Sequence, residues 1–558
     1  ALMTAEAQPL ARIALAVIAA FLLALAMLSW LPERIWARPN IIVVQVDDMA
    51  ASQLQAKIIR NGRRVPAMPV ILGLVEQGAR FNRYYSSLPL CGPSRASLLT
   101  GQMPHNNGMT TNSGRRGYEG WSRAGEERNT LPVWLERTGY RTTHIGKYLN
   151  RYGEGDERTI PPGWSHWVTP THNNGALYYG ADFNVDGRLI SSGGSFESPD
   201  LPWCKPTTIG LPGACHHTTD LYTAHALQEI QRSSRSRRPF YIQLDFNAPH
   251  EDGHDPPGPA RQGRLRELRV AGPPAWMTRP GRNGANAPDY LRRLPRINPA
   301  TRKTIRTRWK NEVAALHGVD QGVGAILTAL RQVRELDNTY LFFVSDNGIF
   351  HGQHRVSYGK YMPHEPSTRQ PLVISGPRVE PGNRKYLAST PDLTKTILDL
   401  TGVRPGRKLD GISLRPELFD KGRGQARAVS IEGFTIRGGR GPEIERSSAE
   451  DPNAARRLAF SGFLSGRWKY VRYAYGEEEL YDLKRDPLER RNLAGESRMR
   501  ERLRWARRAE SYLADCQGRR CRPPADLRGL KIAKPVVSPE RRELLDALFW
   551  APNRNPGI

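Results

Sequence analysis

Three short apolar segments of this chain each end directly in polar side chains, and this pattern restricts the possible folds most strongly. Residues 41–46, 240–246 and 340–344 are rich in β-branched and aromatic side chains, which is typical of strands buried on both faces of a parallel sheet. The polar endings are Asp47-Asp48, Asn247-Ala248-Pro249-His250 and Ser345-Asp346-Asn347-Gly348. One such ending would fit an ordinary turn. Three of them predict a shared site beyond the carboxyl ends of the strands, where open α/β sheets bind ligands.

Segments with helical periodicity accompany these strands. Residues 309–331 and 391–400 are amphipathic and fit crossover helices, the second with Thr390 as its N-cap and Pro391 in its first turn. From about residue 425 the pattern changes to short antiparallel strands, at residues 459–463 and 468–473. The chain therefore combines an α/β part with a smaller part of different architecture.

The N-terminal region is a continuous apolar run. Residues 13–28 contain no charge, and Ala24-Leu25-Ala26 offers a small-x-small cleavage site, as in a secretory signal. Residues 13–31, with Trp30 and Trp36 near the end of the run, are also long enough for an uncleaved membrane anchor. Both alternatives predict an exported protein, either secreted or held at the extracytoplasmic face of the membrane.

The chain has few cysteines for its length, and four of the five lie in close pairs. Cys204 and Cys215 share a stretch rich in Gly and Pro, and Cys516 and Cys521 are near neighbours. Two local disulfides, formed in an oxidising compartment, would leave Cys91 as the unpaired thiol. Four reduced thiols are the alternative.

The charge balance is strongly basic, with 82 Lys and Arg against 55 Asp and Glu, or a net charge of +27. Such a balance favours acidic partners, which include sulfated or phosphorylated polymers. A solvated surface of an Arg-rich protein is the alternative. No nucleic-acid-binding motif accompanies the charge, so we expect no nucleic acid partner. The basic residues gather at 232–238, 261–269, 279–310 and 498–508.

Residues 90–101 carry the most specific motif, Leu-Cys-Gly-Pro-Ser-Arg-Ala-Ser-Leu-Leu-Thr-Gly. The string resembles the signature of the sulfatase family, Cys-x-Pro-Ser-Arg followed by Leu-Thr-Gly, and matches it without a gap. A buried structural cysteine at a helix N-terminus is the alternative. The resemblance extends over roughly residues 39–495, because Glu479-Leu480-Tyr481-Asp482 and Asn492-Leu493-Ala494 are similar to the C-terminal part of that family.

The resemblance implies an α/β fold in which a large, mostly parallel mixed sheet is sandwiched by helices. A smaller C-terminal subdomain would contain an antiparallel sheet and a helix. The expected organisation is a signal peptide or anchor over residues 1–38, a catalytic domain over 39–425, the C-terminal subdomain over 426–515 and an irregular tail over 516–558. Residues 254–308, rich in Pro and Arg, are expected to be a long surface insertion.

In the sulfatase family the signature cysteine is oxidised to formylglycine, so the resemblance implies this modification of Cys91. The hydrated aldehyde would be the nucleophile that attacks sulfur, with Asp346 as its base. A divalent cation would lie between the modified Cys91 and oxygen ligands from Asp47, Asp48, Asp346 and Asn347. Oxygen ligation favours Ca²⁺, with Mg²⁺ as the alternative, over Zn²⁺.

The resemblance also assigns roles to four basic residues. Arg95 would orient the nucleophile, and Lys147 in Gly146-Lys147-Tyr148 would bind sulfate. Lys360 would hold sulfate and the leaving oxygen, and His250 would donate a proton to the leaving alcohol. Taken singly, the lysines would fit surface positions and the histidine a turn.

One position departs from the family pattern. Many sulfatases carry a His two residues after the first lysine, where this chain has Leu149, so the base for the elimination step stays open. The string from Gly146 to Gly153, with Pro162-Gly163-Trp164 after it, is similar to the N-acetylglucosamine-6-sulfatase branch. For His351 and His354, which are near the site in sequence, both substrate contact and a structural role fit.

The sequence therefore predicts a sulfuric ester hydrolase that acts on a sulfated sugar, a sulfated polysaccharide or a small aryl or alkyl sulfate. A formylglycine-generating enzyme would be a transient partner. The alternatives are a phosphodiester or phosphonate monoester hydrolase of the same superfamily, and a catalytically inactive polyanion-binding protein.

Overall fold

A large mixed sheet forms the centre of the computed structural model, which describes residues 38–171, 178–179, 181–191, 217–236, 238–252, 265, 267–274, 286–420, 427–434 and 459–522. The expected signal or anchor, the Cys204–Cys215 pair and the tail from residue 523 lie outside the described residues. The described residues from Asn40 onward belong to one compact unit.

Strand pairing confirms the predicted sheet. Parallel pairing joins β10, β1, β9, β5 and β6, and antiparallel strands flank them on both sides. In spatial order the strands are β11 (Arg369–Gln370), β4 (Ala79–Tyr85), β12 (Leu372–Ser375), β10 (Thr339–Ser345), β1 (Asn40–Val46), β9 (Phe240–Asp245), β5 (Arg141–Gly146), β6 (His166–Pro170), β7 (Asp182–Val185) and β8 (Arg188–Ser191), with β13 (Gly382–Ser389) paired to β4.

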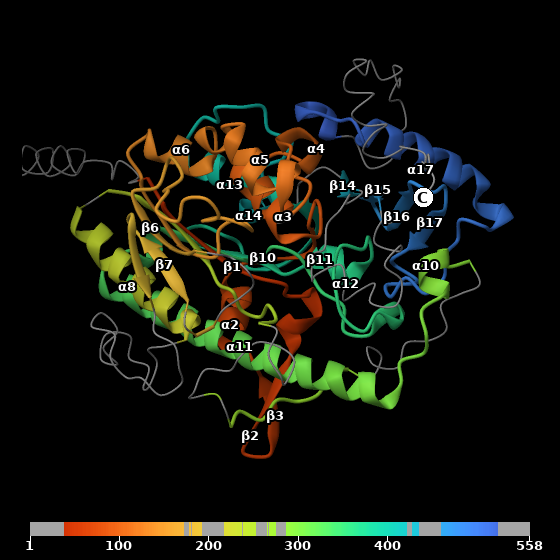
Figure 1. Ribbon diagram of the computed structural model, residues 1–558, viewed down its shortest axis with the longest axis horizontal. Coiled ribbons are helices and arrows are strands. Elements are labelled where there is room, and N and C mark those ends of the chain that lie inside the picture. Colours follow the sequence, from red (N-terminus) through yellow and green to blue (C-terminus); the bar gives the residue numbers. More distant parts are fainter. Residues whose placement is uncertain are drawn as a thin grey trace, which may run out of the picture. The chain divides into compact units, whose positions relative to one another are not determined.

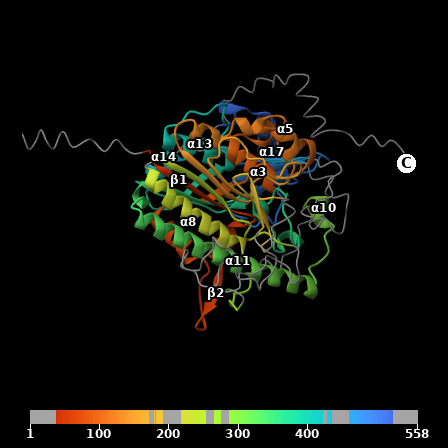
Figure 2. The ribbon, with the colours of Figure 1, turned by 60° about the vertical axis from the view of Figure 1, so that its left-hand side comes forward.

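Helices cover both faces of the sheet, as Figures 1 and 2 show. One face packs against α2 (Pro69–Gln77), α8 (Thr218–Ser236) and α11 (Pro299–Gln332), and the other against α3 (Cys91–Thr100), α6 (Leu131–Glu136), α13 (Thr390–Thr401) and α14 (Arg415–Phe419). Side chains of β1 alternate between these layers, since Ile42 and Val44 join the first core while Ile41 and Val43 join the second. Burial on both faces explains the unbroken apolar run.

Helix α11 is longer than the sequence indicates. Asn298 caps its N-terminus, accepting the Thr301 backbone N–H at 2.8 Å, and Pro299 follows as the first helical residue. The expected insertion is therefore wrong for residues 299–308, which are helical although Ile305 and Arg-rich neighbours give little apolar periodicity. Within the described residues α11 is the one helix long and apolar enough to span a membrane, but most of its apolar window is buried.

A second correction concerns the start of α13. The N-cap is Ser389 rather than Thr390, which is already helical. The Ser389 backbone N–H donates to the Asp392 carboxylate at 2.7 Å, so the capping interaction lies one residue earlier than the sequence suggests.

The predicted C-terminal antiparallel sheet is confirmed. Helix α17 (Arg500–Leu513) packs its apolar face on this sheet through Leu503, Ala506 and Leu513. The strands follow one another in the order β14 (Ala428–Gly433), β15 (Phe460–Ser465), β16 (Trp468–Tyr473) and β17 (Glu478–Asp482). The predicted domain limits stay predictions.

The remaining elements are short. They are a hairpin of β2 (Lys57–Arg60) and β3 (Arg63–Pro66), the α-helices α4 (Pro104–Asn107), α5 (Tyr118–Arg123), α10 (Asp289–Arg292) and α12 (Glu365–Thr368), and the 3₁₀ helices Ala51–Gln55, Gly114–Arg116, Glu126–Arg128, Leu336–Asn338, Gln353–Arg355, Ser497–Met499 and Gly518–Cys521.

A buried lysine ties the C-terminal sheet to helix α12. Lys469 of β16 lies 2.8 Å from the Glu489 carboxylate and 3.4 Å from that of Glu365. We expect Lys469→Met to lower the free energy of unfolding by about 3–5 kcal/mol, because Glu489 would stay buried without its lysine. Chemical denaturation measures the change. Lys408→Met, at an exposed lysine, serves as the control with a change within about 0.5 kcal/mol; equal losses in both variants would contradict the prediction.

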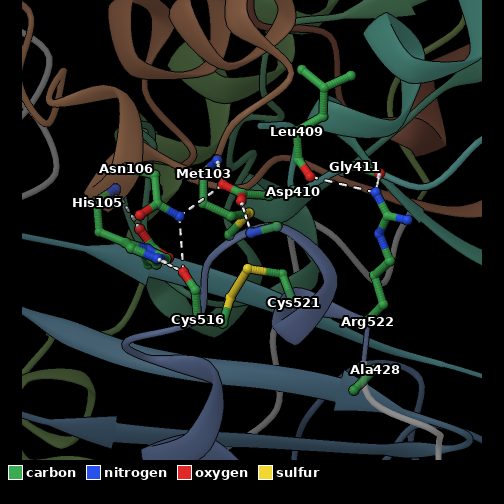
Figure 3. Close-up of a disulfide and its surroundings, with 12 residues drawn as sticks. Met103, His105, Asn106, Leu409, Asp410, Gly411, Ala428, Cys516, Cys521 and Arg522 are labelled. Carbon is green, nitrogen blue, oxygen red and sulfur yellow. Dashed lines mark hydrogen bonds and ion pairs between the residues drawn. A yellow bond between two sulfur atoms is a disulfide. The ribbon is translucent and has the colours of Figure 1, made fainter. Parts of the chain in front are cut away.

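The predicted Cys516–Cys521 disulfide is confirmed, with a Cα–Cα distance of 4.9 Å. Figure 3 shows how its loop is held against residues 103–106 and 409–411. The Cys516 carbonyl accepts from the Asn106 side chain at 2.8 Å and lies 2.8 Å from His105 Nε2. The Gly518 N–H donates to Asp410 at 2.6 Å. These contacts fix the described end of the chain to the α4 region.

His105 should make stability depend on pH. Burial lowers its pKa, but the Glu432 carboxylate, 2.5 Å from Nδ1, outweighs this and raises the pKa to about 9. Because the pKa of His105 is higher in the folded protein, its positive charge stabilises the fold fully below about pH 6.5. This stabilisation is lost as the pH rises through about 9. We expect the protein to lose about 2–4 kcal/mol from this group between pH 6.5 and pH 9.5. His105→Gln should flatten the curve of unfolding free energy against pH, and parallel curves would refute the assignment.

Candidate active site

The ends of the two central strands bring four polar side chains together. Val46 of β1 lies opposite Ser345 of β10, so Asp47-Asp48 and Asp346-Asn347 leave the sheet at the same edge. Asp48 has a left-handed backbone (φ 69°), and its N–H donates to Asp346 Oδ1 at 3.1 Å. The Asn347 amide nitrogen lies 2.6 Å from Asp48 Oδ1. The polar side chains that follow β1 and β10 therefore lie in contact, as the sequence predicts.

The signature motif forms the first turn of α3 and faces these carboxylates. Positions one, four and five of a helix share a face, and this places Cys91, Ser94 and Arg95 toward the strand ends. Cys91 Sγ lies 3.4 Å from Asp47 Oδ1. Ser94 Oγ donates to the Asp346 carbonyl at 2.5 Å, and the Arg95 guanidinium contacts the Asp346 carboxylate at 2.9 and 3.0 Å. Helix α3 thus fixes Cys91 and Asp346 relative to each other.

Two buried lysines approach the same centre from different loops. Lys147 Nζ lies 2.5 Å from Asp47 Oδ2, and Lys360 Nζ lies 2.6 Å from Asp48 Oδ1 and 2.8 Å from Cys91 Sγ. Both lysines are almost fully buried. Cations held at these positions can bind anionic oxygens beside Cys91.

His250 lies at the edge of the cluster. Its Nδ1 is 2.6 Å from the Glu251 carbonyl and therefore carries a proton, since a carbonyl oxygen can only accept. Its Nε2 faces Asp48 Oδ2 at 3.7 Å. Nε2 is thus the nitrogen that can exchange a proton with a group bound in the site.

Burial and charge perturb the acidic groups strongly. Burial raises the pKa of Asp346 to about 7, and the nearby Asp47 charge adds to the increase. Burial also acts to raise the pKa of Asp47, but Lys147 and His250 outweigh it and hold that pKa well below its usual value. For Cys91, burial and then Asp47 raise the pKa of the thiol well above its usual value. The unmodified sulfur is therefore protonated at neutral pH and is a poor nucleophile.

The donor set fits a hard divalent cation. Carboxylate oxygens of Asp47, Asp48 and Asp346 lie within 4.8 Å of one another. Asn347 Oδ1 is buried and has no hydrogen-bond partner in the described part of the chain. Clustered anionic oxygens with a spare amide oxygen match the ligand preference of Ca²⁺ and Mg²⁺. A second group, Asp47, Cys91 and His250, is equally close, but its mixed oxygen, sulfur and nitrogen donors suit a hard cation less well than oxygens alone.

Comparison with known proteins identifies the family. The family model described as Sulfatase matches residues 39–403. The chain belongs to the sulfatase family. Its Cys91, Asp47 and Asp346 all lie within the matched region.

Curated members of the family are similar to this chain at moderate identity. The extracellular sulfatase SULF-1 homolog of Drosophila melanogaster is 28% identical over 392 residues, which are 69% of this chain and 32% of that protein. The human N-acetylglucosamine-6-sulfatase is 29% identical over 396 residues, 68% of this chain and 64% of the human protein. The chain thus spans about a third of the first relative and just under two thirds of the second.

Solved structures share the fold of this chain. A protein solved in complex with its substrate D-glucosamine-2-N,6-O-disulfate has a TM-score of 0.64 at 21% identity, covering 85% of this chain and 96% of that one. The phosphonate monoester hydrolase of Silicibacter pomeroyi has a TM-score of 0.58 at 19% identity, covering 85% and 95%. At these identities the likeness concerns the fold alone.

The sequence did not indicate two acidic residues that contact the site. Asp245, the last residue of β9, lies 3.6 Å from the Arg95 guanidinium and 3.1 Å from His144 Nε2. Glu251, next to His250, pairs with Arg308 of α11 at 3.0 Å. Asp245 stands within the apolar segment 240–246. A charged residue inside such a strand, with no turn beside it, itself indicates a buried ion pair.

The histidines near the site in sequence have other buried partners. His351 Nε2 lies 2.5 Å from Glu312 of α11, and the His354 ring packs against His364 with 4.6 Å between ring centroids. Leu149 is fully buried in the core. These positions fit structural roles, and Leu149 offers no base.

Proposed function

We propose that this sulfatase-family chain hydrolyses sulfate esters with a formylglycine made from Cys91 and a bound Ca²⁺, with Mg²⁺ as the alternative ion. The observation that carries the proposal is the position of Cys91, enclosed by the carboxylates of Asp47 and Asp48 and by the Lys360 ammonium group. Family membership supports the reaction class. The clustered oxygens support the cation.

When present, the hydrated aldehyde at residue 91 would supply a nucleophilic oxygen, and the cation would supply positive charge beside the sulfate oxygens. The residues of the chain do the rest. Lys147 and Lys360 would hold the sulfate oxygens, and their contacts with Asp47 and Cys91 support this role. Arg95, paired with Asp346, fixes the orientation of that carboxylate toward the reacting centre.

Proton transfer falls to Asp346 and His250. Asp346 would accept the proton of the attacking oxygen, and its contact with Arg95 and its position beside Asp47 and Asp48 support this role. The His250 Nδ1–H group donates to the Glu251 carbonyl, and Nε2 can deliver a second proton to the leaving alcohol. Leu149 has no titratable side chain, so another group must act as the base of the elimination step.

The substrate class we propose is a sulfated sugar. Similarity to N-acetylglucosamine-6-sulfatases and the glucosamine disulfate named for a structural neighbour support it. We also propose that the chain is exported, since a relative is an extracellular sulfatase, and that a formylglycine-generating enzyme acts on it transiently. Small aryl and alkyl sulfates are the alternative substrate class.

Hydrolysis of p-nitrophenyl sulfate and of bis-p-nitrophenyl phosphate by the same preparation tests the proposal. We expect a higher kcat/KM for the sulfate ester. Preference for the phosphorus ester would instead favour the phosphonate or phosphodiester hydrolase, the alternative that a structural neighbour supports at fold level. Absence of turnover in protein that carries the modified Cys91 would favour a polyanion-binding protein.

A further inference from the structure

The β2–β3 hairpin extends away from the large sheet in both ribbon views (Figures 1 and 2). It forms a separate two-stranded sheet whose two-residue turn is Asn61-Gly62, with φ values of 50° and 73°. Its base is fixed, because Ile58 packs with Val270 and Trp309 in a small core. The hairpin is therefore a firmly anchored projection.

The projecting part carries only positive charge. Lys57, Arg60, Arg63 and Arg64 are exposed, and residues 57–66 contain no acid. In the regions that the structure describes, these four side chains have no carboxylate or hydrogen-bond partner. Arg269, also exposed, joins them, because its carbonyl accepts the Ile59 N–H at 2.7 Å. The acidic residue of this neighbouring segment is Glu267.

The arrangement of these cations is unfavourable without a ligand. Arg60 lies directly opposite Arg63 in the strand register, and like charges at such positions destabilise a hairpin. Arg64 lies opposite Ile59, and the other neighbour of Ile59 is Arg269. Because successive residues of a strand point to opposite faces, Arg63 and Arg64 put cations on both faces of the hairpin. Bound anionic groups would remove the repulsion between them. The spread of charge over two faces suits a chain of anionic groups better than a single ion.

We propose that the β2–β3 hairpin, with Arg269 beside it, binds a sulfated polysaccharide chain at a site separate from Cys91. Two features support this occupant: several unpaired cations arranged along one projection, and an overall net charge of +27. The proposal deepens the proposed function by naming a polymeric substrate class, and it rests on that function for the link between binding and hydrolysis.

The test is calorimetric titration of the full chain with heparin as the probe at 0.15 M NaCl. The variant Arg60→Gln/Arg63→Gln/Arg64→Gln should bind heparin at least about tenfold more weakly, with a shallower dependence of affinity on salt. Its folding is protected, because glutamine at positions 60 and 63 removes a repulsive pair. Hydrolysis of p-nitrophenyl sulfate should be unchanged.

The matched control removes three exposed arginines from α17, by Arg500→Gln/Arg504→Gln/Arg508→Gln. It carries the same net charge as the hairpin variant and should change heparin affinity less than about threefold. Equal weakening of both variants, or full affinity in the hairpin variant, would overturn the proposal. So would tighter binding to phosphatidylglycerol vesicles than to heparin, which would assign the hairpin to a membrane surface. Because the titration involves no turnover, its failure leaves the proposed hydrolase untouched.

Discussion

Cys91→Ala is expected to lower kcat for p-nitrophenyl sulfate by at least about 10³-fold, the largest effect that we predict for a single residue. Cys91 is fully buried at the start of α3, between the Asp47 carboxylate and the Lys360 ammonium group. Its thiol is protonated at neutral pH because burial raises its pKa. In the proposed mechanism activity depends on an aldehyde at residue 91, and alanine cannot be modified to one.

Cys91→Ser separates the aldehyde from a simple oxygen nucleophile. Serine can take up a sulfate group but cannot release it by reforming an aldehyde, so turnover should also fail. The mass of tryptic peptide Tyr84–Arg95 from the unaltered protein provides the companion measurement, with aldehyde in place of thiol as the expected form. Near-normal turnover by Cys91→Ala with an unchanged melting temperature would refute the assignment of the nucleophile.

Removal of the divalent cation is expected to lower activity by at least about 10²-fold, and added Ca²⁺ or Mg²⁺ should restore it. The physical reason is the set of three clustered carboxylates of Asp47, Asp48 and Asp346, whose mutual repulsion a cation relieves. Dialysis against EDTA, followed by titration with each ion, gives the measurement. Full activity after exhaustive dialysis, or recovery with Zn²⁺ alone, would contradict the assignment.

Asn347→Ala tests the same cation site at a single ligand. The variant should need at least about tenfold more Ca²⁺ for half of its full activity, because the buried Oδ1 of Asn347 would be lost. Asn338→Ala is the matched control, since Asn338 immediately precedes the other end of the same strand, β10. An equal shift in both variants would show that the amide at position 347 is no ligand.

Much of the architecture could be predicted because long apolar runs and helical periodicity are local signals. The runs at residues 41–46 and 340–344 lie in the central strands β1 and β10. The start of α11 was missed, because its first turns are rich in Arg and Lys and gain helical order from the Asn298 cap and the packing of Ile305. The hairpin at residues 57–66 was also missed, although Asn61-Gly62 is a recognised turn signal.

The sequence by itself determined the family resemblance and the strand ends that carry the acidic residues, since both depend on neighbours along the chain. Only the tertiary structure decided which charges meet. Lys360 and Cys91 are 269 residues apart and 2.8 Å from each other, and Asp245 reaches Arg95 through the register of β9 beside β1. Pairing of this kind is set by the packing of strands and loops, because electrostatic energy depends on distance in space and burial rather than on separation along the chain.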